Sequence, residues 1–268
     1  MPSFTLGRKV DPRYKTNLII LIMTITLIIA RGLLTNDWRG SLVFSAGFFL
    51  TWALAREIDP LYEKSAFVAA FIYLSMAMWI ADVNLGVVFW TVLLLRVITR
   101  ITGKKTTVLD LLGLMGLTIY LIIGQGNGIY GLVFTAAMLI GYRRFANEAI
   151  FKVFMLVGLV VSVWGLYSHS ILQLGEAWQM DTFRVMLLLV GLASGVFYGR
   201  MLQKDQGIQD DLGNLIESKY VFLSYIFYLG MYAALLIGTD LGQGTVSLFF
   251  SVILGVALYR VWLWRALR

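Results

Sequence analysis

The chain has 268 residues, of which 59% are hydrophobic and 14% are charged, and its formal net charge is +7. A water-soluble domain is about half apolar and about one quarter charged, so this composition excludes an ordinary soluble fold. It predicts an all-α, polytopic transmembrane helical bundle, because a backbone in lipid must satisfy its polar groups within helices or a closed barrel. The apolar runs are too long for barrel strands.

Ten apolar segments follow one another along the chain, separated by short polar or glycine-rich breaks. Each has 16–20 residues, close to the roughly 20 that a helix needs to cross the hydrocarbon core. The segments cover residues 17–34, 40–56, 65–81, 85–100, 107–123, 128–143, 149–167, 183–200, 219–238 and 244–262. We therefore expect about ten short helices in five hairpins, with the first one retained rather than cleaved as a signal peptide.

The fifth and sixth segments are separated by the stretch 124–128, which contains three glycines and one asparagine. Without this break, residues 107–143 would be too long for one span, and glycine with asparagine is typical of a turn. Thr107 and Asp110 have the spacing of a capping box at the start of the fifth segment. We therefore expect Asp110 to cap a helix rather than to act on a ligand.

Basic residues are concentrated in alternate gaps between the segments. Of the 22 basic residues, 19 lie in these gaps. They are Arg8, Lys9, Arg13, Lys15, Arg56, Lys64, Arg96, Arg100, Lys104, Lys105, Arg143, Arg144, Lys152, Arg200, Lys204, Lys219, Arg260, Arg265 and Arg268. Because basic residues stay cytoplasmic during insertion, the alternation predicts cytoplasmic N- and C-termini in a cell membrane of the bacterial inner-membrane type. Topology thus accounts for the net charge, and no nucleic-acid partner is expected.

The same pattern predicts a basic cytoplasmic segment over residues 1–16 and a single transmembrane domain over 17–268. The two longest loops are an acidic cytoplasmic loop at 201–218 and an outer loop at 168–182, which contains the only histidine, His169. Cysteine is absent. We therefore expect no metal site and no cofactor.

The second segment ends in the densest group of charges beside any predicted span, Arg56, Glu57 and Asp59, with Glu63 and Lys64 following. Charges drawn below the headgroups are costly and are usually paired or functional, so these residues are candidates for substrate binding or coupling. The alternative is a plain helix end. In that case Pro60 stops the helix, the carboxylates cap the next one and Arg56 extends to the interface.

Every second segment ends on an arginine, which suggests five hairpins built to one plan. These residues are Arg56, Arg96, Arg143, Arg200 and Arg260. Together they could form a cytoplasmic ring that binds phosphate or anionic headgroups, with Arg56 and Arg96 as the strongest candidates. The alternative is that the positive-inside rule alone accounts for all five.

Two further patterns lie within the spans. Gly191, Gly195 and Gly199 share one helix face, where bare backbone lets a neighbouring helix approach closely, and we expect this helix in the bundle interior. The hydroxyls of Tyr225, Tyr228 and Tyr232 also share a face. They would line a path for a sugar or lipid headgroup or, as the simpler alternative, form hydrogen bonds between helices.

Three functions fit this architecture. The first is a transporter of a small solute or lipid-linked molecule, with a polar site near the cytoplasmic ends of the second and fourth helices. Ten short helices in hairpins resemble the general layout of drug/metabolite-type exporters, although the chain carries no signature of that family. The second is an intramembrane enzyme acting on an anionic lipid headgroup, and the third is a non-catalytic subunit of a membrane complex. The expected partners are the lipid bilayer, an anionic lipid or small solute, and a membrane-protein partner.

Overall fold

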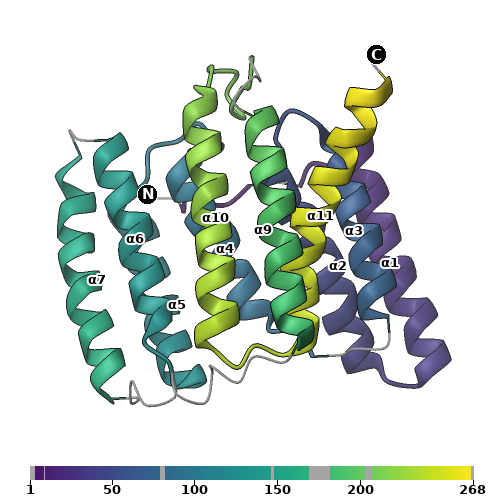
Figure 1. Ribbon diagram of the computed structural model, residues 1–268, viewed down its shortest axis with the longest axis horizontal. Helices are drawn as coiled ribbons and strands as arrows, with labels where there is room; N and C mark the ends of the chain where they lie inside the picture. The colour runs from purple at the N-terminus through teal and green to yellow at the C-terminus, as the bar shows by residue number, and fades with distance from the viewer. Residues whose placement is uncertain are drawn as a thin grey trace. The chain divides into compact units, whose positions relative to one another are not determined.

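The computed structural model describes residues 4–8, 10–78, 82–145, 148–168, 182–202 and 207–266. These ranges contain ten α-helices and no β-strand (Figure 1). The helices are α1 (Lys15–Thr35), α2 (Trp38–Ile58), α3 (Glu63–Ala77), α4 (Leu85–Thr99), α5 (Val108–Gln125), α6 (Ile129–Arg144), α7 (Ala149–Ser168), α9 (Thr182–Leu202), α10 (Ser218–Gly238) and α11 (Gln243–Ala266). Each predicted segment corresponds to one helix, so the predicted all-α bundle is confirmed.

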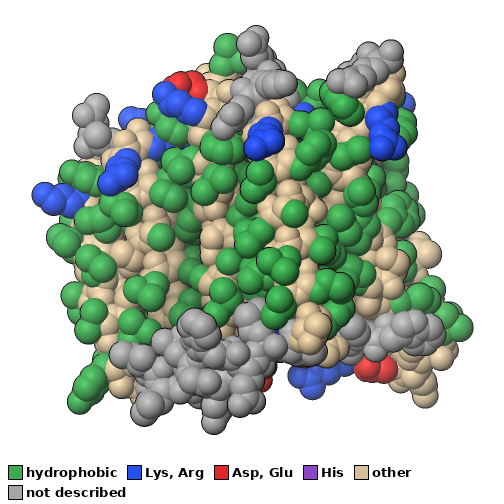
Figure 2. Space-filling view, in the orientation of Figure 1, with side chains coloured by type: hydrophobic (Ala, Val, Ile, Leu, Met, Phe, Trp, Pro, Cys, Tyr) green, Lys and Arg blue, Asp and Glu red, His purple; other side chains and the backbone are tan. Residues whose placement is uncertain are grey.

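Seven of the described helices are long and apolar enough to cross a membrane, namely α1, α2, α5, α7, α9, α10 and α11. The 15-residue α4 is apolar but shorter. Hydrophobic side chains cover the flanks of the helices, and most of the visible basic side chains lie near helix ends (Figure 2). The protein is therefore an integral membrane protein built from apolar helices.

Local signals in the sequence determine where α5 begins and ends. The Thr107 side chain accepts a hydrogen bond from the Asp110 amide, and the Asp110 carboxylate accepts one from the Thr107 amide. This is the predicted capping box. At the other end, Gly126 has a φ of 61°, a left-handed conformation that glycine adopts without strain. The predicted turn thus separates α5 from α6.

The chain divides into two compact units. Unit 1 comprises Met1–Arg8, Trp90–Leu188 and Gln206–Asp240, and unit 2 comprises Lys9–Phe89, Leu189–Asp205 and Leu241–Arg268. Unit 1 therefore contains most of α4, all of α5, α6, α7 and α10, and the start of α9. Unit 2 contains α1, α2, α3, α11 and the remainder of α4 and α9. The expectation of one membrane domain over residues 17–268 stays a prediction.

Helices in unit 2 approach closely where small residues face a neighbour. A Cβ atom added to Gly255 of α11 would lie 2.4 Å from Cα of Ala69 in α3. One added to Gly47 of α2 would lie 2.5 Å from the Tyr73 hydroxyl of α3. Helix α3 therefore packs against both α2 and α11 within unit 2.

In unit 1, α6 and α7 form the most extensive helix pair. A Cβ on Gly131 would lie 2.8 Å from Oγ of Ser162, and one on Gly158 would lie 2.7 Å from Oγ1 of Thr135. The two hydroxyl oxygens are 3.3 Å apart in the same interface. Small residues and paired hydroxyls are the usual means of association for helices in lipid.

Candidate functional site

A buried ion pair joins the end of α2 to α11 in unit 2. Arg260 donates from Nη2 to Oδ1 of Asp59 at 2.6 Å and from Nε to Oδ2 at 3.3 Å. Asp59 is completely buried and Arg260 is 4% exposed. The two parallel contacts give a bidentate arrangement, in which arginine binds a carboxylate most strongly.

Aromatic rings surround the Arg260 guanidinium. Its Cζ lies 4.2 Å from the ring centroid of Tyr62 and 5.4 Å from that of Tyr198. The Tyr198 hydroxyl donates to the carbonyl oxygen of Ile58 at 3.0 Å. Since Ile58 is the last residue of α2, this bond connects α9 to the backbone next to Asp59. The rings exclude water while their faces attract the cation.

Glu57 lies in the last turn of α2 and is 1% exposed. Two buried carboxylates, those of Glu57 and Asp59, therefore occur within three residues of chain, and that of Asp59 is paired with Arg260 of α11. Acidic side chains are seldom fully buried unless they are paired. Their burial here distinguishes the end of α2 from an ordinary solvated helix end.

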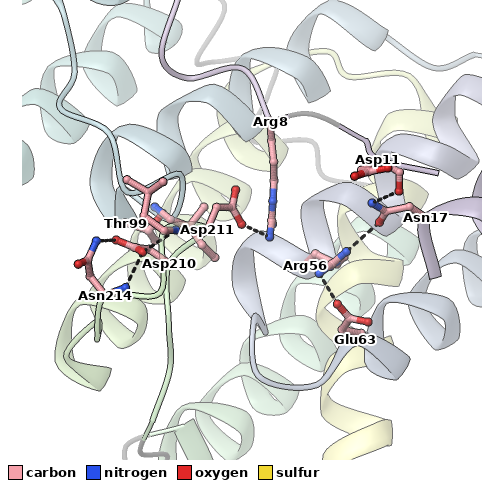
Figure 3. A network of polar contacts seen from close by, with 11 residues as sticks. Arg8, Asp11, Asn17, Arg56, Glu63, Thr99, Asp210, Asp211 and Asn214 are labelled. Carbon is pink, nitrogen blue, oxygen red and sulfur yellow. Dashed lines mark hydrogen bonds and ion pairs between the residues drawn. The ribbon is translucent and has the colours of Figure 1, made fainter. Parts of the chain in front are cut away.

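Arg56 makes a separate set of contacts in unit 2 (Figure 3). Its Nη2 donates to Oε1 of Glu63 at 2.5 Å and its Nη1 to Oδ1 of Asn17 at 3.1 Å, and its guanidinium lies 5.2 Å from the Trp52 ring. Thr16 donates to the other oxygen of Glu63. Arg56 thus links α2 to α1 and α3, whereas Asp59 links α2 to α11.

Of the plain helix-end alternative, the end of α2 before Pro60 is confirmed, whereas the capping of the next helix by the carboxylates is wrong. Helix α2 does end at Ile58, two residues before Pro60. However, the N-cap residue of α3 is Tyr62, and no side chain caps that helix. Asp59 forms its ion pair with Arg260 instead of capping α3.

Arg96, the other predicted phosphate ligand, lies in unit 1, where its Nη1 donates to the carbonyl oxygen of Leu6 at 2.9 Å. The same N-terminal segment is held by Asp110, which accepts hydrogen bonds from the Thr5 amide at 2.7 Å and the Thr5 hydroxyl at 2.6 Å. Arg8 then pairs with Asp211 at 2.6 Å (Figure 3). Arg96 therefore helps to anchor residues 4–8.

Tyr225, Tyr228 and Tyr232 lie in α10 of unit 1 and are almost fully buried. The Tyr232 hydroxyl is buried without a hydrogen-bond partner among the described residues. The tyrosine path for a headgroup stays a prediction.

Gly191, Gly195 and Gly199 are buried, as a packing face requires. Other sides of α9 are exposed, for example Leu189 at 61% and Val196 at 58%. Only part of the α9 surface is therefore buried, and the helix is less interior than expected.

His169 and most of the outer loop 168–182 lie outside the described residues.

The partners of the buried charges cannot be identified from the sequence pattern. Arg260 is one of the five arginines near segment ends. It differs from the others in lying further from the C-terminal end of its helix. It precedes the end of α11 at Ala266 by six residues, which is about 9 Å along the axis. Glu63 follows the predicted charge cluster in the sequence, whereas Tyr62 and Tyr198 carry no signal that would relate them to the site.

The fold and the site define a polytopic helical membrane protein with a buried, aromatic-enclosed ion pair at the end of α2. No protein-family model, no curated protein and no solved structure matches the chain.

Proposed function

We propose that the protein is a transporter of a small solute or lipid-linked molecule and that its polar site lies at the end of α2, at Arg56, Glu57 and Asp59 together with Arg260. The observation that carries the proposal is the buried Asp59–Arg260 ion pair. Charged side chains inside membrane helices are costly, and they typically mark substrate or proton pathways.

The energetics of buried ion pairs support a functional reading. Replacing such a pair with well-packed apolar side chains is often neutral or stabilising, so stability alone is weak grounds for keeping it. A solute that carries an anionic group can compete with Asp59 for the guanidinium of Arg260.

The proposed site does not include Arg96. Its guanidinium donates to the Leu6 carbonyl in unit 1. This contact gives Arg96 a role in anchoring residues 4–8, so the proposal rests on the contacts at the end of α2 alone.

The alternation of basic residues indicates on which side of the membrane the site lies. Arg56 and Arg260 lie in the C-terminal parts of α2 and α11 and belong to the basic set, so under the positive-inside rule the site lies toward the cytoplasm. We propose cytoplasmic N- and C-termini in a cell membrane on the same grounds.

Reconstituted protein tests the proposal. Proteoliposomes on a solid-supported membrane would be exposed to a panel of small carboxylates, sugar phosphates, nucleotides and amines while the evoked current is recorded. We expect at least one class to evoke a current, and we expect Glu57→Gln to abolish it. Asp240→Asn is the matched control, because its carboxylate is fully exposed.

The outcomes separate the hypotheses. A full current from Glu57→Gln would remove Glu57 from the site. If no solute class evoked a current from the folded wild-type protein, the transporter reading would be rejected in favour of a non-catalytic subunit.

A further inference from the structure

Two arginines of unit 1 meet on one aromatic ring, outside the site proposed for transport. The Arg100 guanidinium lies 3.3 Å from the ring centroid of Phe145, and that of Arg144 lies 4.8 Å from it. Arg144 also lies 4.0 Å from the ring of Tyr220. Arg100 follows α4, Arg144 ends α6 and Tyr220 lies in the first turn of α10, so this arginine–aromatic cluster joins the ends of three helices.

The cluster has more positive than negative charge. Arg100 is ion-paired with Glu148, and Lys219 with Glu217. Three cations, including Arg144, face two carboxylates, which leaves a net charge of +1. The only hydrogen-bond acceptor that the described residues offer to Arg144 is the carbonyl oxygen of Ile98. A guanidinium has five N–H donors, so most donors of this half-buried side chain remain available.

The geometry points to a binding site for an anionic phosphate group at Arg144 and Arg100. A guanidinium matches phosphate oxygens in a bidentate manner, and the aromatic rings fix its plane before a ligand arrives. The C-terminal end of α6 and the N-terminal end of α10 lie at the same end of unit 1 (Figure 1).

Residues Leu139 of α6 and Leu223 and Ile226 of α10 are exposed and apolar, between 36% and 46%. They lie within about two helical turns of Arg144 or Tyr220 along the helix axis, and they offer an apolar surface to an acyl chain. A phosphate at a helix end with an apolar tail along the helices is the chemistry of an anionic phospholipid. Basic pockets between membrane helices recognise such headgroups. This site is independent of the transport proposal, because it uses none of the residues at the end of α2.

Ligand-dependent thermal stability of the full chain in neutral detergent tests the inference. The probes are a short-chain phosphatidylglycerol, the matched phosphatidylcholine and inorganic phosphate. A ligand that binds only the folded state raises the Tm with its concentration. We expect phosphatidylglycerol to raise the Tm more than the other two probes.

Arg143→Gln is the matched control, because it removes the same charge from the neighbouring exposed residue. We expect Arg144→Gln to weaken phosphatidylglycerol binding by about tenfold, the scale of one charge-assisted hydrogen bond, and Arg143→Gln to leave it unchanged. If Arg144→Gln does not fold, Arg144→Lys replaces it, and we expect a smaller loss because the charge remains without the planar fork.

The probes also distinguish the source of the phosphate. A shift with phosphatidylglycerol alone assigns a lipid, whereas an equal shift with inorganic phosphate supports the site and assigns a soluble ligand. Equal affinities of the Arg143 and Arg144 variants, or no shift with any probe, would overturn the inference.

Discussion

Asp59 and Arg260 are 201 residues apart in the sequence, yet their side chains form a bidentate ion pair that is closed off from solvent. This contact connects α2 to α11. It also brings into the candidate site a residue that no local pattern associates with Asp59.

Removing one partner of this pair should destabilise the protein strongly. Asp59→Asn or Arg260→Gln would leave an uncompensated buried charge, which typically costs about 3–5 kcal/mol. Thermal unfolding in detergent should therefore show a markedly lower Tm for either variant. Asp240→Asn removes a fully exposed carboxylate and serves as the control. A Tm equal to that of the wild type for both single variants would mean that the pair does not form.

The N-terminal segment should detach when Asp110 is truncated. Asp110→Ala removes the capping box and both hydrogen bonds to Thr5, whereas Thr5→Val removes only the hydroxyl contacts. We expect faster trypsin cleavage after Arg8 in Asp110→Ala and an intermediate rate in Thr5→Val. Cleavage at the wild-type rate in Asp110→Ala would show that Asp110 does not hold the segment.

The sequence predicted the helices because the information that defines them is local. An apolar run, a glycine turn at 124–128 and a capping box at Thr107 each act over a few residues, and each lies where the structure has it. The contacts of the site are different. Arg96 donates to the backbone carbonyl of Leu6, and every residue carries such an acceptor, so the sequence offers no means of choosing it. The partner of Asp59 depends on which helices pack together.

Because α3 and α11 pack closely, we expect the stability of the protein to depend strongly on Gly255. A Cβ at this position would lie 2.4 Å from backbone Cα of Ala69, so Gly255→Ala should force the helices apart and cost about 1–3 kcal/mol. Gly230→Ala is the matched control, because no atom lies within 4 Å of its added Cβ. We expect a lower Tm for the first variant only, and equal Tm values would contradict the helix contact.

The proposed sidedness predicts where lysines can be labelled. Lys104 and Lys105 belong to a gap of the basic set, so a membrane-impermeant amine reagent should not modify them in intact cells but should do so after the cells are opened. Mass spectrometry of the labelled peptides gives the result. Modification in intact cells would contradict the cytoplasmic placement of this gap.

The most direct test of the proposed function separates the stability of the ion pair from its role in transport. In the double variant Asp59→Leu/Arg260→Met, apolar side chains replace both charges, and such replacements are often neutral or stabilising. The measurement is the solute-evoked current of this variant in proteoliposomes, with its Tm measured in parallel. We predict a Tm close to that of the wild type and no current. A stable double variant that carries the wild-type current would contradict the proposal that this ion pair acts on the transported molecule.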